Sequence, residues 1–230
     1  MNVLVACEES QTVCKAFREK GHEAYSCDIQ KCSGGLPKYH IYMDARAVIN
    51  GGVFRLQTGD KITIPKWDLI IAHPPCTYLS NAATSAHSLR VTPINWINAR
   101  TQNRLEAMRF FMDFVNANCD RVSIENPVGV MNTCYRKADQ IIDPYLFSNG
   151  KEDIENFVTK KTCLWLKGLP PLIPTYTGEK PNNAELFGRK PTGKPMTWAE
   201  AISRDPSVRS KTFPGIAKAM AEQWGGENND

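Results

Sequence analysis

Short runs of apolar residues recur along the chain, and each run is bounded by polar or turn-forming residues. Runs of this length, rich in Val, Ile and Leu, are typical of strands that are buried on both faces of a parallel sheet. The pattern predicts strands at residues 3–6, 23–27, 41–43, 67–72, 121–124 and 160–167.

Apolar residues at helical spacing predict helices at residues 12–20, 95–117 and 216–224. For the first of these, Ser10 is the expected N-cap and Gly21 the expected stop. Strands that alternate with helices indicate an α/β fold with a mostly parallel sheet. Between the predicted elements, we expect a short helix with a Gly-rich connection at residues 45–65 and an irregular stretch at residues 131–157. Residues 168–195 are expected to form a basic irregular lobe.

The 230 residues suit one α/β domain with a small appended lobe, and the 42% hydrophobic and 23% charged content is ordinary for a soluble protein. We expect residues 1–148 to form the cofactor-binding and catalytic core. Residues 149–206 are expected to form a short variable lobe that includes the strand near 160–167, and residues 207–230 to return to the core.

No stretch approaches the roughly 20 apolar residues that span a bilayer, and the N-terminus runs into a strand without a basic region, so neither a membrane span nor a signal peptide is predicted. The eight cysteines are dispersed and form no CxxC pair, so we expect no metal and a reduced, cytoplasmic location. The net charge of +4 tilts mildly toward an anionic partner.

Two of the predicted strands are followed by candidate catalytic residues. The strand at 67–72 stops at Pro74 and Pro75, which hold Cys76 on a stiff turn, and Glu125 follows the strand at 121–124. Because one helix joins these strands, the right-handed crossover rule makes them expected neighbours. A thiol and an acid are therefore expected in one cleft at the carboxyl edge of the sheet.

The first strand–helix–strand unit has the layout of a dinucleotide or S-adenosyl site, with Asp28 after the second strand. Its first turn, at residues 6–10, lacks the glycines that a pyrophosphate needs, so NAD, FAD and nucleoside triphosphates are disfavoured. Glu8 and Glu9 in this turn would repel phosphates and tolerate a cationic sulfonium. Alternatively, they simply favour the N-terminus of the helix.

A thiol paired with a carboxyl group suits one reaction in particular. A thiolate adds to C6 of a cytosine while the carboxyl group holds N3, and the resulting enamine makes C5 nucleophilic toward a methyl sulfonium. No His and Asn pattern of a cysteine protease stands out around Cys76.

Pro74-Pro75-Cys76 and Glu125-Asn126-Pro127 resemble the PC and ENV motifs of the DNA (cytosine-5) methyltransferases. The chain is similar to the short phage- and prophage-type members of that family from end to end. The stretches that carry the resemblance are residues 5–8, 26–28, 67–78, 124–128, 162–172 and 209–224. Pro127 stands where the family commonly has valine.

The resemblance implies a Rossmann-like class I methyltransferase fold: a mostly parallel seven-stranded sheet with helices on both faces and a small irregular basic lobe. It implies Cys76 as nucleophile, Glu125 as the acid at N3, S-adenosylmethionine as cofactor and duplex DNA with a flipped cytosine as partner. The implied cofactor-binding residues are Ala6, Cys7, Glu8, Ser10, Asp28 (ribose), Ile29 (adenine), Asp44 (adenine amino group), Pro74, Pro75 and Thr212. The expected substrate-binding residues are Asn126, Lys160, Lys161 and Arg90.

Two other functions remain open from the sequence. One is a catalytically weak or inactive DNA-binding relative, and the other is an enzyme that modifies C5 of a cytosine nucleotide. The recognition sequence, the oligomeric state and a role in protection from restriction are not determined by these patterns.

Overall fold

The computed structural model of the chain describes residues 1–81, 93–202 and 205–226. Its centre is a seven-stranded sheet with the strand order β3-β2-β1-β6-β7-β9-β8. All neighbouring pairs from β3 to β7 are parallel, and β9 runs antiparallel to both β7 and β8. The strands are β1 (Asn2–Ala6), β2 (Glu23–Asp28), β3 (His40–Tyr42), β6 (Leu69–Ala72), β7 (Val122–Pro127), β8 (Gln140–Ile142) and β9 (Thr162–Lys167).

The fold is thus α/β with a mostly parallel mixed sheet, compatible with a Rossmann-like arrangement. The six predicted strands are confirmed, and the expected pairing of the strands that precede Cys76 and Glu125 is confirmed as β6 beside β7. Two features were not predicted: the short edge strand β8 and an antiparallel hairpin of β4 (Gly52–Arg55) and β5 (Lys61–Ile64). These strands are three or four residues long and half-exposed, so they lack a continuous apolar run.

The three predicted helices are confirmed as α1 (Thr12–Glu19), α2 (Ile94–Val115) and α7 (Pro214–Gly225). Several single-turn elements occur outside these three helices. They are α3 (Met131–Cys134), α4 (Asn183–Phe187), α5 (Trp198–Ala201), α6 (Pro206–Ser210) and the 3-10 turns η1 (Pro37–Tyr39), η2 (Ala45–Ala47) and η4 (Pro144–Phe147).

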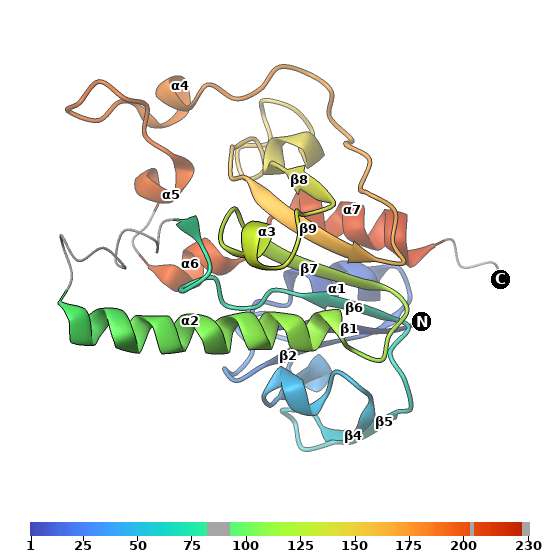
Figure 1. The fold of residues 1–230 in the computed structure, drawn as a ribbon. Coiled ribbons are helices and arrows are strands. Elements are labelled where there is room, and N and C mark those ends of the chain that lie inside the picture. Colours follow the sequence, from blue (N-terminus) through green and yellow to red (C-terminus); the bar gives the residue numbers. More distant parts are fainter. Residues whose placement is uncertain (82–92, 203–204, 227–230) are drawn as a thin grey trace.

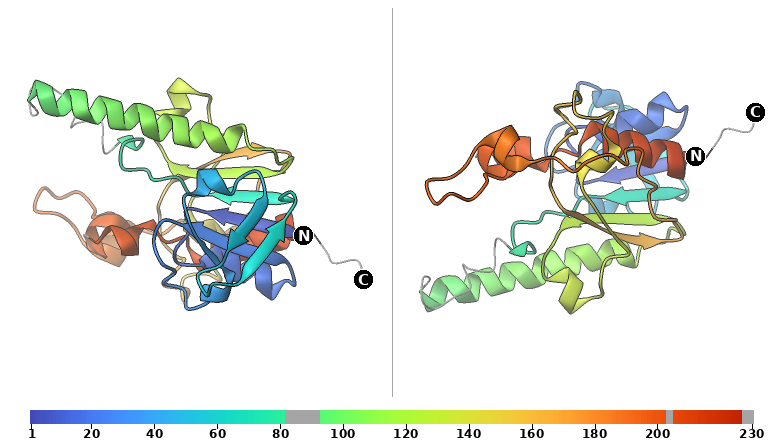
Figure 2. Two further views of the ribbon diagram at one scale, coloured as in Figure 1. Left: turned by 90° about the horizontal axis from the view of Figure 1, so that it is seen from below. Right: turned by 90° about the horizontal axis from the view of Figure 1, so that it is seen from above.

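Helices cover both faces of the sheet, because alternate residues of a strand point to opposite sides. Val3 and Val5 of β1 pack in a core with α1 and α7, whereas Leu4 packs in a second core with Phe111 and Phe114 of α2. Figure 2 shows this layering, with α7 and α2 on opposite sides of the strands.

Two parts of the chain extend past the carboxyl ends of the parallel strands. The strands run away from the N-terminus, and both the start of α2 and the segment of α4 and α5 project on that side (Figures 1 and 2). The buried residues of α2, Phe111 and Phe114, lie in its last two turns. The first half of α2 is therefore a largely solvated rod beside the carboxyl edge.

Within the described residues, no helix is both long and apolar enough to cross a membrane. The same residues contain no cluster of three or more His, Cys, Asp and Glu side chains that could hold a metal ion. All eight cysteines are free thiols.

Candidate functional site

The candidate site lies where β1, β6 and β7 end. The parallel register pairs Ala6 with Ala72 and Ala72 with Ile124. The next residues along β6 and β7, His73 and Glu125, are therefore level with each other and point to the same side of the sheet. From β1 the chain continues to β2 on one side, while β6 lies on the other side of β1. The strand order therefore reverses between β1 and β6. Open α/β sheets bind ligands at such a point.

His73 and Glu125 form a buried pair at this edge. His73 Nδ1 lies 3.0 Å from Glu125 Oε2, and their side chains are 8% and 21% exposed. Desolvation opposes ionisation of both groups, but their mutual hydrogen bond and opposite charges outweigh it. The pKa of Glu125 is therefore lowered, and the pKa of His73 is raised.

Cys76 begins a tight turn that is tied to the end of β7. The amide of Asn126 donates to the Pro74 carbonyl oxygen at 2.7 Å, and the Cys76 carbonyl oxygen accepts from the N–H groups of Leu79 and Ser80. A side chain at Gly129 would collide with the Leu79 carbonyl oxygen, so only glycine permits this close approach. The segments that follow β6 and β7 are thus locked together.

The Cys76 side chain keeps an exposed surface, yet neighbouring protein partly desolvates its thiol. Desolvation and the charge of Glu125 raise the pKa of Cys76, while Lys160 and Arg209 oppose the increase. The thiol is therefore protonated at neutral pH in the ligand-free protein. The charge of Glu125 acts on the Cys76 thiol, which indicates that the acid and the thiol lie near each other at this edge of the sheet.

Lys160 enters the same site from the segment that precedes β9. Its Nζ donates to the Arg209 carbonyl oxygen at 2.9 Å and lies over the rings of Trp198 and Phe213. Its charge lowers the pKa of Glu125. Lys161 is exposed, and its charge acts on Asp143 instead, so the structure brings only the first of the two predicted lysines to the site.

Neither Arg209 nor His73 was predicted to be a functional residue. Arg209 belongs to α6, and only the return of the chain to the core brings its charge near Cys76. The sequence signal that could have identified Arg209 is its position three residues before Thr212, a predicted cofactor-binding residue. The predicted substrate residue Arg90 lies outside the described residues.

The turn after β1 takes a strained form without glycine. Cys7 and Gln11 both have φ near 60°, a left-handed conformation that glycine normally supplies. The buried Gln11 side chain fixes the turn by donating to the Leu36 carbonyl oxygen and accepting from the Leu36 N–H, both at 2.9 Å. The loop before Leu36 packs so closely that a side chain at Gly34 would overlap the Ser10 carbonyl oxygen.

Glu8 caps α1. Its buried carboxylate accepts from the N–H groups of Val13 at 2.6 Å and Cys14 at 3.2 Å. The predicted N-cap role of Ser10 is wrong, because Gln11 occupies the N-cap position and the Ser10 hydroxyl contacts Thr12. Of the two interpretations of Glu8, the structure favours the helix terminus over a ligand contact.

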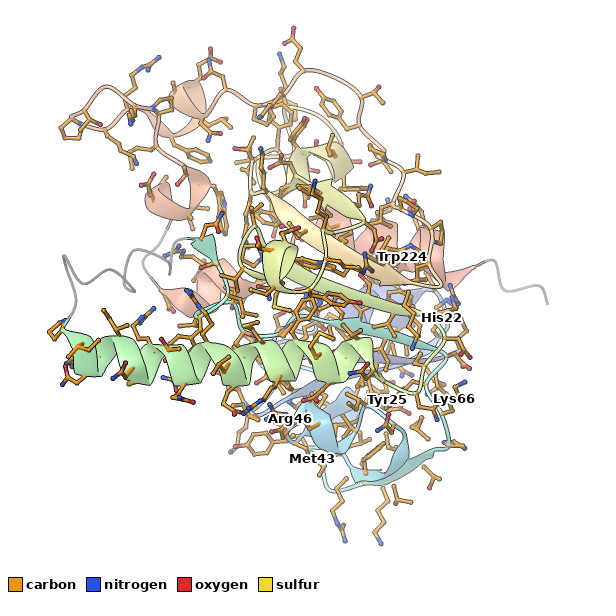
Figure 3. The ribbon with its side chains drawn as sticks, in the orientation of Figure 1. His22, Tyr25, Met43, Arg46, Lys66 and Trp224 are labelled. Carbon is orange, nitrogen blue, oxygen red and sulfur yellow. The ribbon has the colours of Figure 1, made fainter. Side chains whose placement is uncertain are left out.

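The predicted acidic residues gather around the same turn. Asp28, at the end of β2, and Asp44, after β3, both help to raise the pKa of the Cys7 thiol, after burial as the first cause. Asp28 accepts from the Gln30 N–H and Asp44 from the Arg46 N–H, each at 2.8 Å. Arg46, which is labelled in Figure 3, also pairs with Asp113 of α2.

An apolar patch lies between these acids. Ile29 is 70% exposed, and Tyr42 and Met43 are also exposed. Burial raises the pKa of Glu9, and the charge of Lys211 opposes this increase. Because Lys211 directly precedes Thr212, the segment of Thr212 lies near the turn. Carboxylates beside an exposed apolar surface suit a ligand that has hydroxyls, a flat ring and a positive charge.

No protein-family model matches this chain, and no curated protein matches it either. The geometry of the site and the motif resemblance therefore carry the functional argument.

Proposed function

We propose that this chain is an S-adenosylmethionine-dependent DNA cytosine-5 methyltransferase. The observation that carries the proposal is the meeting of Cys76 and Glu125 at one sheet edge, with Cys76 shortly after the end of β6, Glu125 near the end of β7, and each in a motif that resembles the family's. The mostly parallel seven-stranded sheet with helices on both faces supports it.

The described residues fit the cofactor. In this proposal Asp28 accepts from the ribose hydroxyls, the exposed Ile29 contacts the adenine face and Asp44 accepts from the adenine amino group. Glu9 and Asp28 favour a cationic sulfonium, and the turn at Cys7 takes the left-handed backbone form without glycine. When bound, S-adenosylmethionine supplies an electrophilic methyl group.

The residues of the chain then divide the chemistry. The Cys76 sulfur bonds to C6 of the cytosine, while Glu125 donates a hydrogen bond or a proton to N3, and C5 becomes nucleophilic. After C5 is methylated, its proton leaves to a base, the bond between sulfur and C6 breaks and the cytosine regains aromaticity. The cytosine must leave the duplex, because a side chain at a sheet edge cannot reach C6 inside the base stack.

The first half of α2 supports DNA as the partner. Residues 94–104 contain two arginines, four side-chain amides and no acidic residue, and these are the groups that contact phosphates and base edges. Trp96 is 65% exposed at the projecting end. Near Cys76, the Arg104 Nε donates to the Tyr78 carbonyl oxygen at 3.0 Å, which links this helix to the nucleophile's turn.

The test is to trap the covalent step. The protein, S-adenosylmethionine and mixed-sequence duplexes that contain 5-fluorocytosine are incubated and separated on denaturing gels. Fluorine at C5 blocks the final elimination, so an adduct that maps to Cys76 is expected. Cys76→Ser should abolish the adduct, whereas Cys134→Ser, which changes another exposed thiol, should retain it.

The two alternatives predict different results. A cytosine-nucleotide enzyme would form no DNA adduct and would methylate free dCMP. An inactive DNA-binding relative would bind duplexes but form no adduct with either substrate. Both results would contradict the proposal.

A further inference from the structure

His73 has no role in the reaction as proposed above, although it lies beside Glu125. It follows β6 directly, three residues before Cys76, and its Nδ1 lies 3.0 Å from Glu125 Oε2. The side chain is almost fully buried, and its Nε2 has no hydrogen-bond partner among the described residues. Burying an imidazole nitrogen without a partner is unfavourable, so packing alone does not account for a histidine at this position.

Three charged groups act on this imidazole. Glu125 faces it from β7, Glu8 from the turn after β1 and Lys160 from the segment before β9. Desolvation and Lys160 lower the pKa of His73, but the hydrogen bond and the charges of Glu125 and Glu8 outweigh them. These influences therefore favour an imidazolium beside a carboxylate.

In this charge state, Glu125 alone cannot be the proton donor of the proposed reaction. The pKa of Glu125 is lowered, so its carboxyl group is ionised before substrate arrives and cannot by itself protonate N3. The protonated imidazole of His73 lies within hydrogen-bond distance of this carboxylate and can therefore supply the proton. A carboxylate that takes this proton on one oxygen becomes a neutral acid, and rotation of the carboxyl group turns the protonated oxygen toward a base on its other side.

We propose that His73 and Glu125 jointly store one proton and deliver it to N3 of the flipped cytosine. His73 Nδ1 gives its proton to Glu125 Oε2, rotation of the carboxyl group turns this oxygen toward the cytosine, and Oε2 passes the proton to N3 as the thiolate sulfur of Cys76 bonds to C6. The thiol proton goes to solvent. When the bond between sulfur and C6 breaks, the N3 proton returns by the same route, and His73 is a positioning residue that acts through Glu125.

The first test does not depend on the reaction. The chain has four histidines, so titration of a ¹⁵N-histidine-labelled sample followed by NMR can resolve each one, and loss of a signal in His73→Asn assigns His73. We expect the pKa of His73 to lie above its ordinary value of 6.5 and to fall in Glu125→Gln. A pKa at or below 6.5, or one unaffected by Glu125→Gln, would overturn the stored proton.

The second test measures delivery without cofactor. Reversible addition of Cys76 to C6 allows C5 of cytosine to exchange its hydrogen for deuterium in D₂O, which mass spectrometry of the DNA detects. His73→Asn keeps a donor at the position of Nδ1 but has no titratable proton. We expect the wild-type exchange rate to decline as the pH rises through the pKa of His73, and we expect His73→Asn to lower the rate about 100-fold and to abolish that decline.

The outcomes separate this inference from the proposed function on which it rests. Wild-type rates and pH dependence in His73→Asn would overturn the delivery step while leaving the methyltransferase proposal intact. Absence of exchange in the wild type, together with absence of the fluorocytosine adduct, would overturn both, and the NMR titration would still decide whether the pair holds the proton.

Discussion

The side-chain amide of Asn126 donates to the carbonyl oxygen of Pro74 at 2.7 Å, and this buried bond ties the end of β7 to the segment that carries Cys76. Pro74 belongs to the proline pair that ends β6, and Asn126 follows Glu125 directly. The bond therefore fixes the distance between the thiol and the acid.

Asn126→Asp should weaken the site, because a carboxylate cannot donate to the Pro74 carbonyl oxygen. We expect the unfolding free energy at pH 7 to fall by about 1–3 kcal/mol, and adduct formation with 5-fluorocytosine DNA to slow. Urea unfolding and the denaturing gel measure the two effects. Asn116→Asp makes the same change at an exposed position and should leave both unchanged. An adduct rate in Asn126→Asp equal to that of the wild type would contradict the role of the bond.

Ile29→Ala should weaken cofactor binding without destabilising the protein, because the side chain is 70% exposed and has little packing to lose. The expected increase in the dissociation constant, measured by calorimetry, is about tenfold, since an isoleucine contact with a flat ring contributes roughly 1–2 kcal/mol. Ile173→Ala is the matched control at 72% exposure. Equal affinities of the two variants would remove Ile29 from the proposed adenine site.

The double variant Asn98→Asp/Gln102→Glu should reduce affinity for duplex DNA by about tenfold, roughly 1.4 kcal/mol, and the defect should shrink at high salt. Both positions are exposed on the projecting half of α2, so folding should be unaffected. Fluorescence anisotropy of a labelled duplex measures the affinity. Lys218→Glu lowers the net charge by the same amount at an exposed position of α7 and serves as the control. An equal loss of affinity in both would indicate net charge rather than contact through α2.

The buried pair of His73 and Glu125 should also shape stability against pH. The raised pKa of His73 gives a contribution that is fully present below its ordinary value of 6.5 and is lost as the pH rises through the raised value. The lowered pKa of Glu125 gives a contribution that is present above its ordinary value of 4.5 and is lost as the pH falls through the lowered value.

The stability advantage of the wild type over His73→Asn should therefore be greatest between pH 4.5 and 6.5 and should decline on both sides. Urea unfolding of both proteins across a pH series measures this difference, in which distant titrating groups cancel. A difference that does not change with pH would show that the pair carries no charge in the folded protein.

The sequence alone predicted the parallel strands, the three long helices and the neighbouring positions of Cys76 and Glu125. These features are local or follow from chain geometry: continuous apolar runs specify buried strands, and the handedness of the crossover makes β6 and β7 adjacent. The β4–β5 hairpin escaped prediction because its strands are short and half-exposed, so burial left little pattern in them.

Only the tertiary structure decided which polar groups meet. Glu8 caps α1 from outside the usual N-cap position, because the left-handed backbone at Cys7 and Gln11 folds its carboxylate back onto the helix. Lys160 comes to Cys76 and Lys161 does not, although the two are adjacent in sequence. The register of β6 against β7 pairs His73 with Glu125, and register depends on packing across the whole sheet rather than on either strand alone.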